Sequence, residues 1–144
     1  MAELCMKAVL AAVLLSCGIV DFLRKRVYIW MLVAGGILVF ALLPFCHEIT
    51  LASRLAGAAT GAAIILLSFI SGGKIGLGDG ILLCITGLGL GFWGNMELFC
   101  LALMLAAGLS IILMIFRKAD RRMSIPFVPF MLAGYLIILF TGLN

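Results

Sequence analysis

The sequence predicts an all-α, polytopic membrane protein with about six transmembrane helices and with both chain ends outside the cytoplasm. Of its 144 residues, 66% are hydrophobic and 11% are charged, and the mean hydropathy is +1.37. A soluble domain carries roughly 25% charged residues. Most of the apolar runs approach the roughly 20 residues that a helix needs to cross a bilayer. The length suits one domain, so residues 1–144 are expected to form a single integral-membrane unit.

Six apolar runs define the expected helices. The fourth run is short and rich in glycine, which predicts a helix packed among its neighbours, because small residues let helix backbones approach closely. Gly57 and Gly61 repeat this device in the third run. The runs cover about residues 4–22, 27–45, 51–70, 79–93, 96–116 and 125–142.

Basic residues fix the predicted orientation. Eight of the ten lie in the gaps after the first, third and fifth runs, and only Lys7 and Arg54 lie on the opposite side. The positive-inside rule places those three gaps in the cytoplasm. The net charge of +4 therefore indicates orientation and contact with anionic lipid headgroups, and it does not imply nucleic acid.

Two aspartates lie at the predicted cytoplasmic boundary, each on a different apolar helix. Asp21 ends the first run and Asp79 begins the fourth. An Asp in the middle of a span costs about 2.5–3.5 kcal/mol on insertion scales, so such a residue usually has a functional or pairing role. Asp120 also lies on this side, but a solvated ion pair within its basic loop explains it.

An aspartic protease within a membrane requires at least two carboxyl groups at the same depth in the bilayer. Two such groups held close together cannot both ionise cheaply, so one keeps its proton and the other accepts a proton from water. The pair titrates as a unit, so acid and base cannot be assigned to individual residues. Gly76 and Gly78 precede Asp79, and they are expected to permit irregular backbone through which an extended substrate approaches.

These residues resemble those of the type IV prepilin peptidases, which belong to the GxGD membrane aspartic peptidases. The first patch is Asp21 followed by the basic residues 24–26 and then Val27 and Trp30. The second is Gly76-Leu77-Gly78-Asp79. The third is Ile125-Pro126-Phe127-Val128-Pro129-Phe130, which is similar to the family's entry into its last helix.

The resemblance implies a membrane aspartic endopeptidase that removes the short basic leader of prepilin or pseudopilin substrates at the cytoplasmic face of the plasma membrane. It implies Asp21 and Asp79 as catalytic residues, with Gly76, Gly78, Pro126, Phe127 and Pro129 shaping the site. The substrate's apolar helix stays in the bilayer after the cut. Tyr28 and Ile29 replace the family's Pro-Asn, Gly80 and Ile81 replace its Val-Lys, and Val128 replaces a Gly. The paired-cysteine segment of the larger members is missing, so N-methyltransferase activity is not implied.

Other interpretations fit fewer residues. A small proton-coupled transporter, or a pilus assembly protein without peptidase activity, would also use intramembrane carboxylates, although transporters usually place them near the midplane. Residues 14–18 resemble a lipoprotein signal, and Ser71 with Lys74 could form a Ser/Lys pair. His47 is the only histidine and the five cysteines are scattered, so neither a metal nor another cofactor is predicted. Nothing in the sequence specifies an oligomeric state.

Overall fold

The computed structural model describes residues 2–24, 28–46, 48–72, 76–116 and 126–141. Within these ranges the chain is helical and contains no strand, which confirms the all-α prediction. The α-helices are α1 (Ala2–Arg24), α2 (Ile29–Leu42), α3 (Leu51–Ile70), α4 (Leu77–Ile115) and α5 (Val128–Thr141), and the 3₁₀ turn η1 (Leu43–Phe45) extends α2.

Three of these helices are long and apolar enough to cross a membrane: α1 from Glu3 to Arg24, α3, and α4. The segment Ile29–Phe45 and α5 are apolar but shorter. Large apolar side chains point outward, and Trp30 and Phe140 are 83% and 89% exposed. A surface of this kind needs lipid as its solvent, so the chain is a membrane protein.

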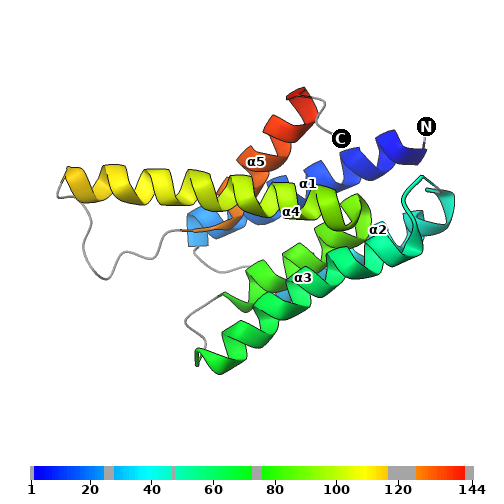
Figure 1. Ribbon diagram of the computed structural model, residues 1–144, viewed down its shortest axis with the longest axis horizontal. Helices are drawn as coiled ribbons and strands as arrows, with labels where there is room; N and C mark the ends of the chain where they lie inside the picture. The colour runs from blue at the N-terminus through cyan, green and yellow to red at the C-terminus, as the bar shows by residue number, and fades with distance from the viewer. Residues whose placement is uncertain (1, 25–27, 47, 73–75, 117–125, 142–144) are drawn as a thin grey trace.

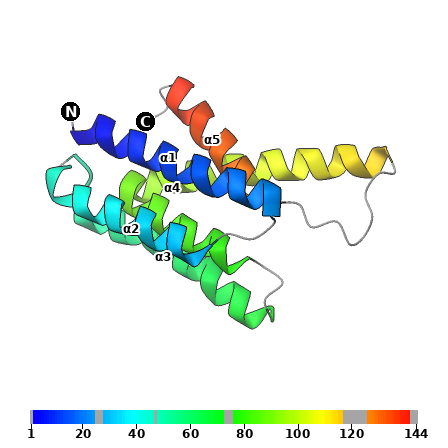
Figure 2. The same cartoon turned by 180° about the vertical axis from the view of Figure 1, so that it is seen from behind.

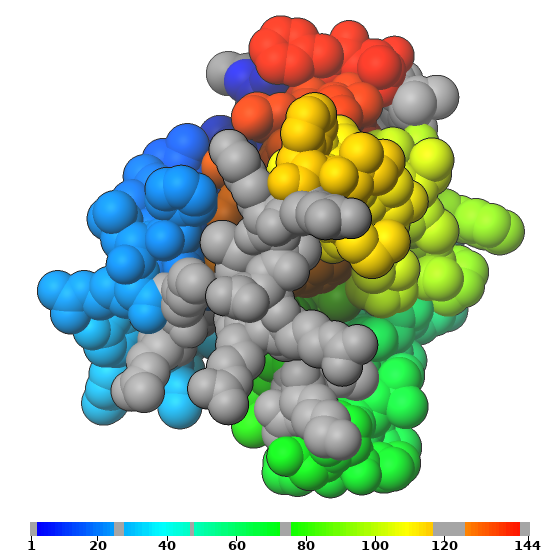
Figure 3. Space-filling view, turned by 90° about the vertical axis from the view of Figure 1, so that its left-hand side faces the viewer, coloured from blue at the N-terminus to red at the C-terminus, as the bar shows by residue number. Residues whose placement is uncertain are grey.

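The helices traverse the molecule back and forth (Figure 1). The first residues of α1 and the last residues of α5 lie toward one side of the molecule. The last residues of α1 and the first residues of α4 lie toward the opposite side. From behind, α1 lies between α5 and α2 (Figure 2), and it contacts both of them. Figure 3 looks onto the end at which α1 and α3 finish. The topology therefore carries Asp21 and Asp79 to a common end.

Glycines hold α3 directly against the first part of α4. A Cβ atom on Gly57 would lie 2.6 Å from the Gly87 carbonyl oxygen, and one on Gly61 would meet Cys84. Neither position has room for a side chain, so the two backbones touch. The structure thus confirms the packing role predicted for Gly57 and Gly61, and it confirms that the glycine-rich helix is buried among its neighbours.

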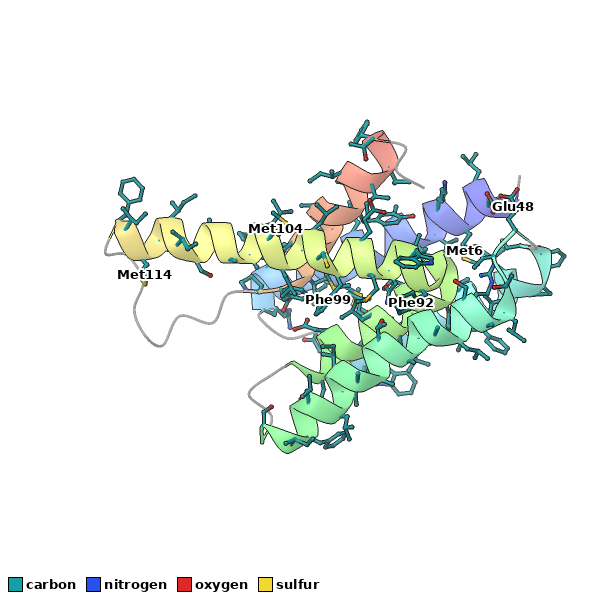
Figure 4. The ribbon with its side chains drawn as sticks, in the orientation of Figure 1. Met6, Glu48, Phe92, Phe99, Met104 and Met114 are labelled. Carbon is teal, nitrogen blue, oxygen red and sulfur yellow. The ribbon has the colours of Figure 1, made fainter. Side chains whose placement is uncertain are left out.

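Helix α4 is broken at Gly91. This residue has φ 74° and ψ −174°, a conformation that is essentially restricted to glycine. The chain turns there, and residues 92–115 run back past the bundle as a separate helical segment that projects at one side (Figures 1 and 4). Met104 and Met114 on this segment are exposed. Two predicted runs therefore correspond to the two parts of α4.

Two consecutive side chains of α3 replace the hydrogen bond lost at the break. In a continuous helix the Phe92 N–H would donate to the Leu88 carbonyl. Here Phe92 donates to Ser53 Oγ at 3.1 Å, and Arg54 donates to the Leu88 carbonyl at 2.8 Å. Arg54 also donates to the carbonyls of Ile49 and Cys46, and it is only 4% exposed. Arg54 is therefore a structural residue of the interior as well as part of the predicted charge asymmetry.

A polar cluster fastens the two parts of α4 to each other and to α3. Asn95 is fully buried, and its amide donates to Thr60 Oγ1 at 2.7 Å and to the carbonyls of Gly57 and Leu83. Its Oδ1 accepts from Thr86 at 2.7 Å. Because each polar atom of Asn95 has a partner, the cluster stabilises the reversal without leaving an unsatisfied group in the interior.

Several predicted boundaries differ from those in the structure. The third run matches α3 at both ends, but α1 continues to Arg24 and so includes part of the predicted basic gap. Helix α4 begins at Leu77, so Gly78 is helical and the irregular backbone expected there is wrong. The division between the fourth and fifth runs lies at Gly91, whereas it was predicted between residues 93 and 96. The basic gaps at 25–26, 74 and 117–122 lie outside the described residues.

The orientation predicted from the basic residues can be tested directly. If the six predicted runs all cross the membrane with the basic gaps in the cytoplasm, a reporter fused after Asn144 will lie outside the cytoplasm and one inserted near Arg121 will lie inside it. Alkaline phosphatase and green fluorescent protein fusions at both positions measure this. Cytoplasmic signals from both positions would show that the sixth run does not cross the membrane and that the six-span count is wrong.

Candidate active site

Asp21 is buried in the last turn of α1, with 7% of its surface exposed. Its Oδ2 accepts a hydrogen bond from the backbone N–H of Val128, the first residue of α5, at 3.4 Å. Within the described residues this is the sole hydrogen bond of the Asp21 side chain, and no cation is paired with it. A buried carboxyl with one neutral donor is far from saturated, since a carboxylate has about four acceptor positions.

Asp79 is the third residue of α4, and its carboxyl group lies back over the helix start. Gly76 is the N-cap of α4. A Cβ atom placed on Gly76 would be 2.7 Å from Oδ2 and 3.2 Å from Cγ of Asp79. The glycine therefore makes room for the aspartate's own carboxyl, which differs from the predicted role of admitting substrate backbone. Gly78 is the second residue of α4.

The two aspartates interact. α1 contacts α4, and Asp21 is close enough that its charge acts on the carboxyl of Asp79. Burial also removes water from both groups. No described donor or cation neutralises Asp79. The structure thus brings together two incompletely paired carboxyls on different helices, as the sequence predicts. Such an arrangement is suited to exchanging a proton with a bound water.

The third predicted patch lies beside Asp21. The carbonyl of Phe127 begins α5 by accepting from Phe130 and Met131, and the Phe127 ring packs edge-on against Phe99 of α4 at 6.3 Å. Phe99 projects from α4 in Figure 4. Pro129 lies beside α1, since a Cβ atom placed on Gly18 would be 3.9 Å from the Cα of Pro129. Pro126, Phe127 and Pro129 therefore form the turn that delivers the Val128 N–H to Asp21.

Gly76→Ala is expected to reduce any activity of the aspartate pair while leaving the fold intact. The new methyl group displaces the Asp79 carboxyl, and a misplacement of about 1 Å can reduce a rate by ~10²-fold. We expect kcat/KM to fall roughly 10- to 100-fold, measured beside the melting temperature in detergent. Gly108→Ala is the control, because a Cβ there meets nothing within 4 Å. Equal activity of the two variants would contradict the assigned role of Gly76.

Among the described residues, the structure assembles neither a Ser/Lys pair nor a metal site. Ser71 Oγ donates to the Ser68 carbonyl at the end of α3, while Lys74 lies outside the described residues. His47 also lies outside them. Among the residues that the structure describes, no three His, Cys, Asp or Glu side chains are grouped as metal ligands.

A charged cavity lies away from the aspartates. Its volume is about 230 Å³, and Glu3 and Glu48, whose carboxyl groups lie close enough to interact, line it with Lys7, Arg54 and Met6. Met6 and Glu48 lie near the start of α1 in Figure 4. The sequence places these residues on the predicted outer side but gives no sign that they meet.

Sequence reasoning missed Asn95 and the Ser53–Arg54 pair. The available signal was a lone Asn in the very short gap between the fourth and fifth apolar runs, because polar side chains at membrane depth require partners. Comparison of the chain with protein-family models, with curated proteins and with solved structures found no match.

Proposed function

We propose that the protein is a membrane aspartic endopeptidase with Asp21 and Asp79 as its catalytic pair. The observation that carries the proposal is that the buried Asp21 and the half-buried Asp79, on different helices at one end of the molecule, lie close enough for their carboxyl groups to interact. One carboxyl in its ionised form would take a proton from water, while the protonated partner would polarise the scissile carbonyl. The step needs no metal or organic cofactor.

The proposed substrates are prepilin-like proteins whose short basic leader is removed at the cytoplasmic face of the plasma membrane. This part rests on the resemblance of three sequence patches to the type IV prepilin peptidases, together with the basic gaps. The proposal also includes six membrane crossings, with α2, α5 and both parts of α4 among them. Exposed apolar side chains on α2 and α5 support contact with lipid by these shorter helices.

Cleavage of a co-expressed substrate tests the proposal. The substrate carries a short basic leader ending in Gly before a long apolar helix, and we expect a product shortened by the leader. Asp79→Asn should abolish the product, because an amide neither takes nor gives the required proton. Glu97→Gln is the control acid on the second part of α4. Full processing by Asp79→Asn, at normal expression, would rule out the aspartate pair.

A proton-coupled transporter remains the second candidate, and the charged cavity favours it. Glu3, Lys7 and Glu48 offer titratable groups at the end remote from the aspartates, and Asn95 places polar atoms inside the bundle. The Asn95 cluster is fully paired with protein atoms, which argues against a water-filled path. Proton flux into liposomes that depends on Asp79, without substrate cleavage, would favour the transporter.

A further inference from the structure

A backbone donor at the start of α5 is satisfied by Asp21 of α1. A helix leaves its first four N–H groups without intrahelical partners of the usual kind. In α5 the second of these positions is Pro129, which has no N–H, and the N–H groups of Phe130 and Met131 both donate to the Phe127 carbonyl. The N–H of Val128 has no partner within the helix, and it donates to Asp21 Oδ2.

The segment that carries this donor is held on two sides. Phe127 packs against Phe99 from α4, and Val128 and Pro129 approach Gly18, which precedes Asp21 by about one helical turn. Val128 is fully buried. The donor is therefore fixed relative to both helices that carry the aspartates. Asp21 has no other described hydrogen bond, so this single contact determines how its carboxyl is turned.

We infer that the backbone N–H of Val128 is a positioning group for the catalytic step, an inference that rests on the proposed peptidase function. It holds Oδ2 of Asp21 and so fixes the plane of the carboxyl, leaving Oδ1 available to water. The entry turn of α5 thereby aligns an aspartate distant by 107 positions in the chain. The N–H donates to Asp21 and Val128 is fully buried, so its removal should affect turnover more than substrate binding.

Val128→Pro removes the donor without disturbing the helix start. Position 128 is the first of α5, where proline is favoured because its fixed φ suits a helix and its N–H is not needed internally. Val128→Ala is the matched control, since it keeps the N–H and loses more side-chain volume. A bond from N–H to a carboxylate is worth a factor of roughly 10 to 100, so kcat should fall by that much in Val128→Pro with KM nearly unchanged.

A second variant separates loss of the hydrogen bond from misfolding of the Val128→Pro protein. Incorporation of the α-hydroxy acid analogue of valine at position 128 replaces only the N–H by an ester oxygen and keeps the isopropyl group. It should lower kcat as the proline variant does, and by more than Val128→Ala, which keeps the N–H. If the ester protein turns over like wild type, or if only KM changes, the positioning role is wrong. Failure of the wild-type protein to cleave any prepilin-like substrate would instead refute the proposed function.

Discussion

Asp21→Asn should abolish peptidase activity and leave the protein folded, whereas Asp21→Ala should abolish activity and also destabilise the fold. The distinction follows from the two roles of this side chain. An Asn oxygen still accepts the Val128 N–H but cannot take a proton from water. An Ala removes the acceptor and leaves a buried donor without a partner, at a cost of about 1–3 kcal/mol.

The measurement is substrate cleavage beside the melting temperature of each purified variant. For both variants we expect cleavage to fall by about 10³-fold or more, as it does when one member of a cooperating catalytic set is removed. Only Asp21→Ala should melt clearly below wild type. An active Asp21→Asn protein would show that Asp21 only accepts the hydrogen bond at the start of α5 and takes no part in catalysis.

Arg54→Leu should be among the most destabilising single substitutions in the chain. It removes the donor that serves three carbonyls, of which that of Leu88 lost its usual partner at the Gly91 break. Bonds from a charged donor are worth about 1.5–3 kcal/mol each, although those between membrane helices are often weaker, so we expect a loss of about 2–4 kcal/mol.

Companion variants isolate the contribution of the break. Arg54→Lys should recover part of the loss, because an ammonium group can satisfy some of the carbonyls but lacks the planar fork. Ser53→Ala removes the acceptor of the Phe92 N–H and should cost about 1 kcal/mol. Reversible unfolding in detergent by circular dichroism measures all three variants. Wild-type stability of Arg54→Leu would mean that the break does not depend on α3.

The sequence was informative wherever a residue's own chemistry decided its location. Apolar runs predicted the helices, and the extent of α3 was correct at both ends. The glycines of α3 and α4 were correctly interpreted as packing positions. Asp21 and Asp79 were expected at one end of the molecule because Asp21 ends the first apolar run and Asp79 begins the fourth. The structure places both residues at one end.

The sequence was less informative wherever a residue's role depends on a partner that is distant in the chain. Several glycines in residues 80–94 could each have interrupted α4, and Gly91 does so because Ser53 and Arg54 lie beside it. Gly76 was assigned to substrate access, but its neighbour is the Asp79 carboxyl, which the order of residues cannot reveal. The role of Val128 depends on contact with α1 and was hidden for the same reason.

The contact of α5 with α1 has a consequence for biosynthesis. Val128 N–H bonds to Asp21, and Tyr135 donates to the Lys7 carbonyl at 2.9 Å, so the last helix closes onto the first. During translation Asp21 enters the membrane long before the residues that orient it have been made. Under the proposed function, the nascent chain would stay catalytically incomplete until its final helix inserts, and neighbouring membrane proteins would not be exposed to an active peptidase during synthesis.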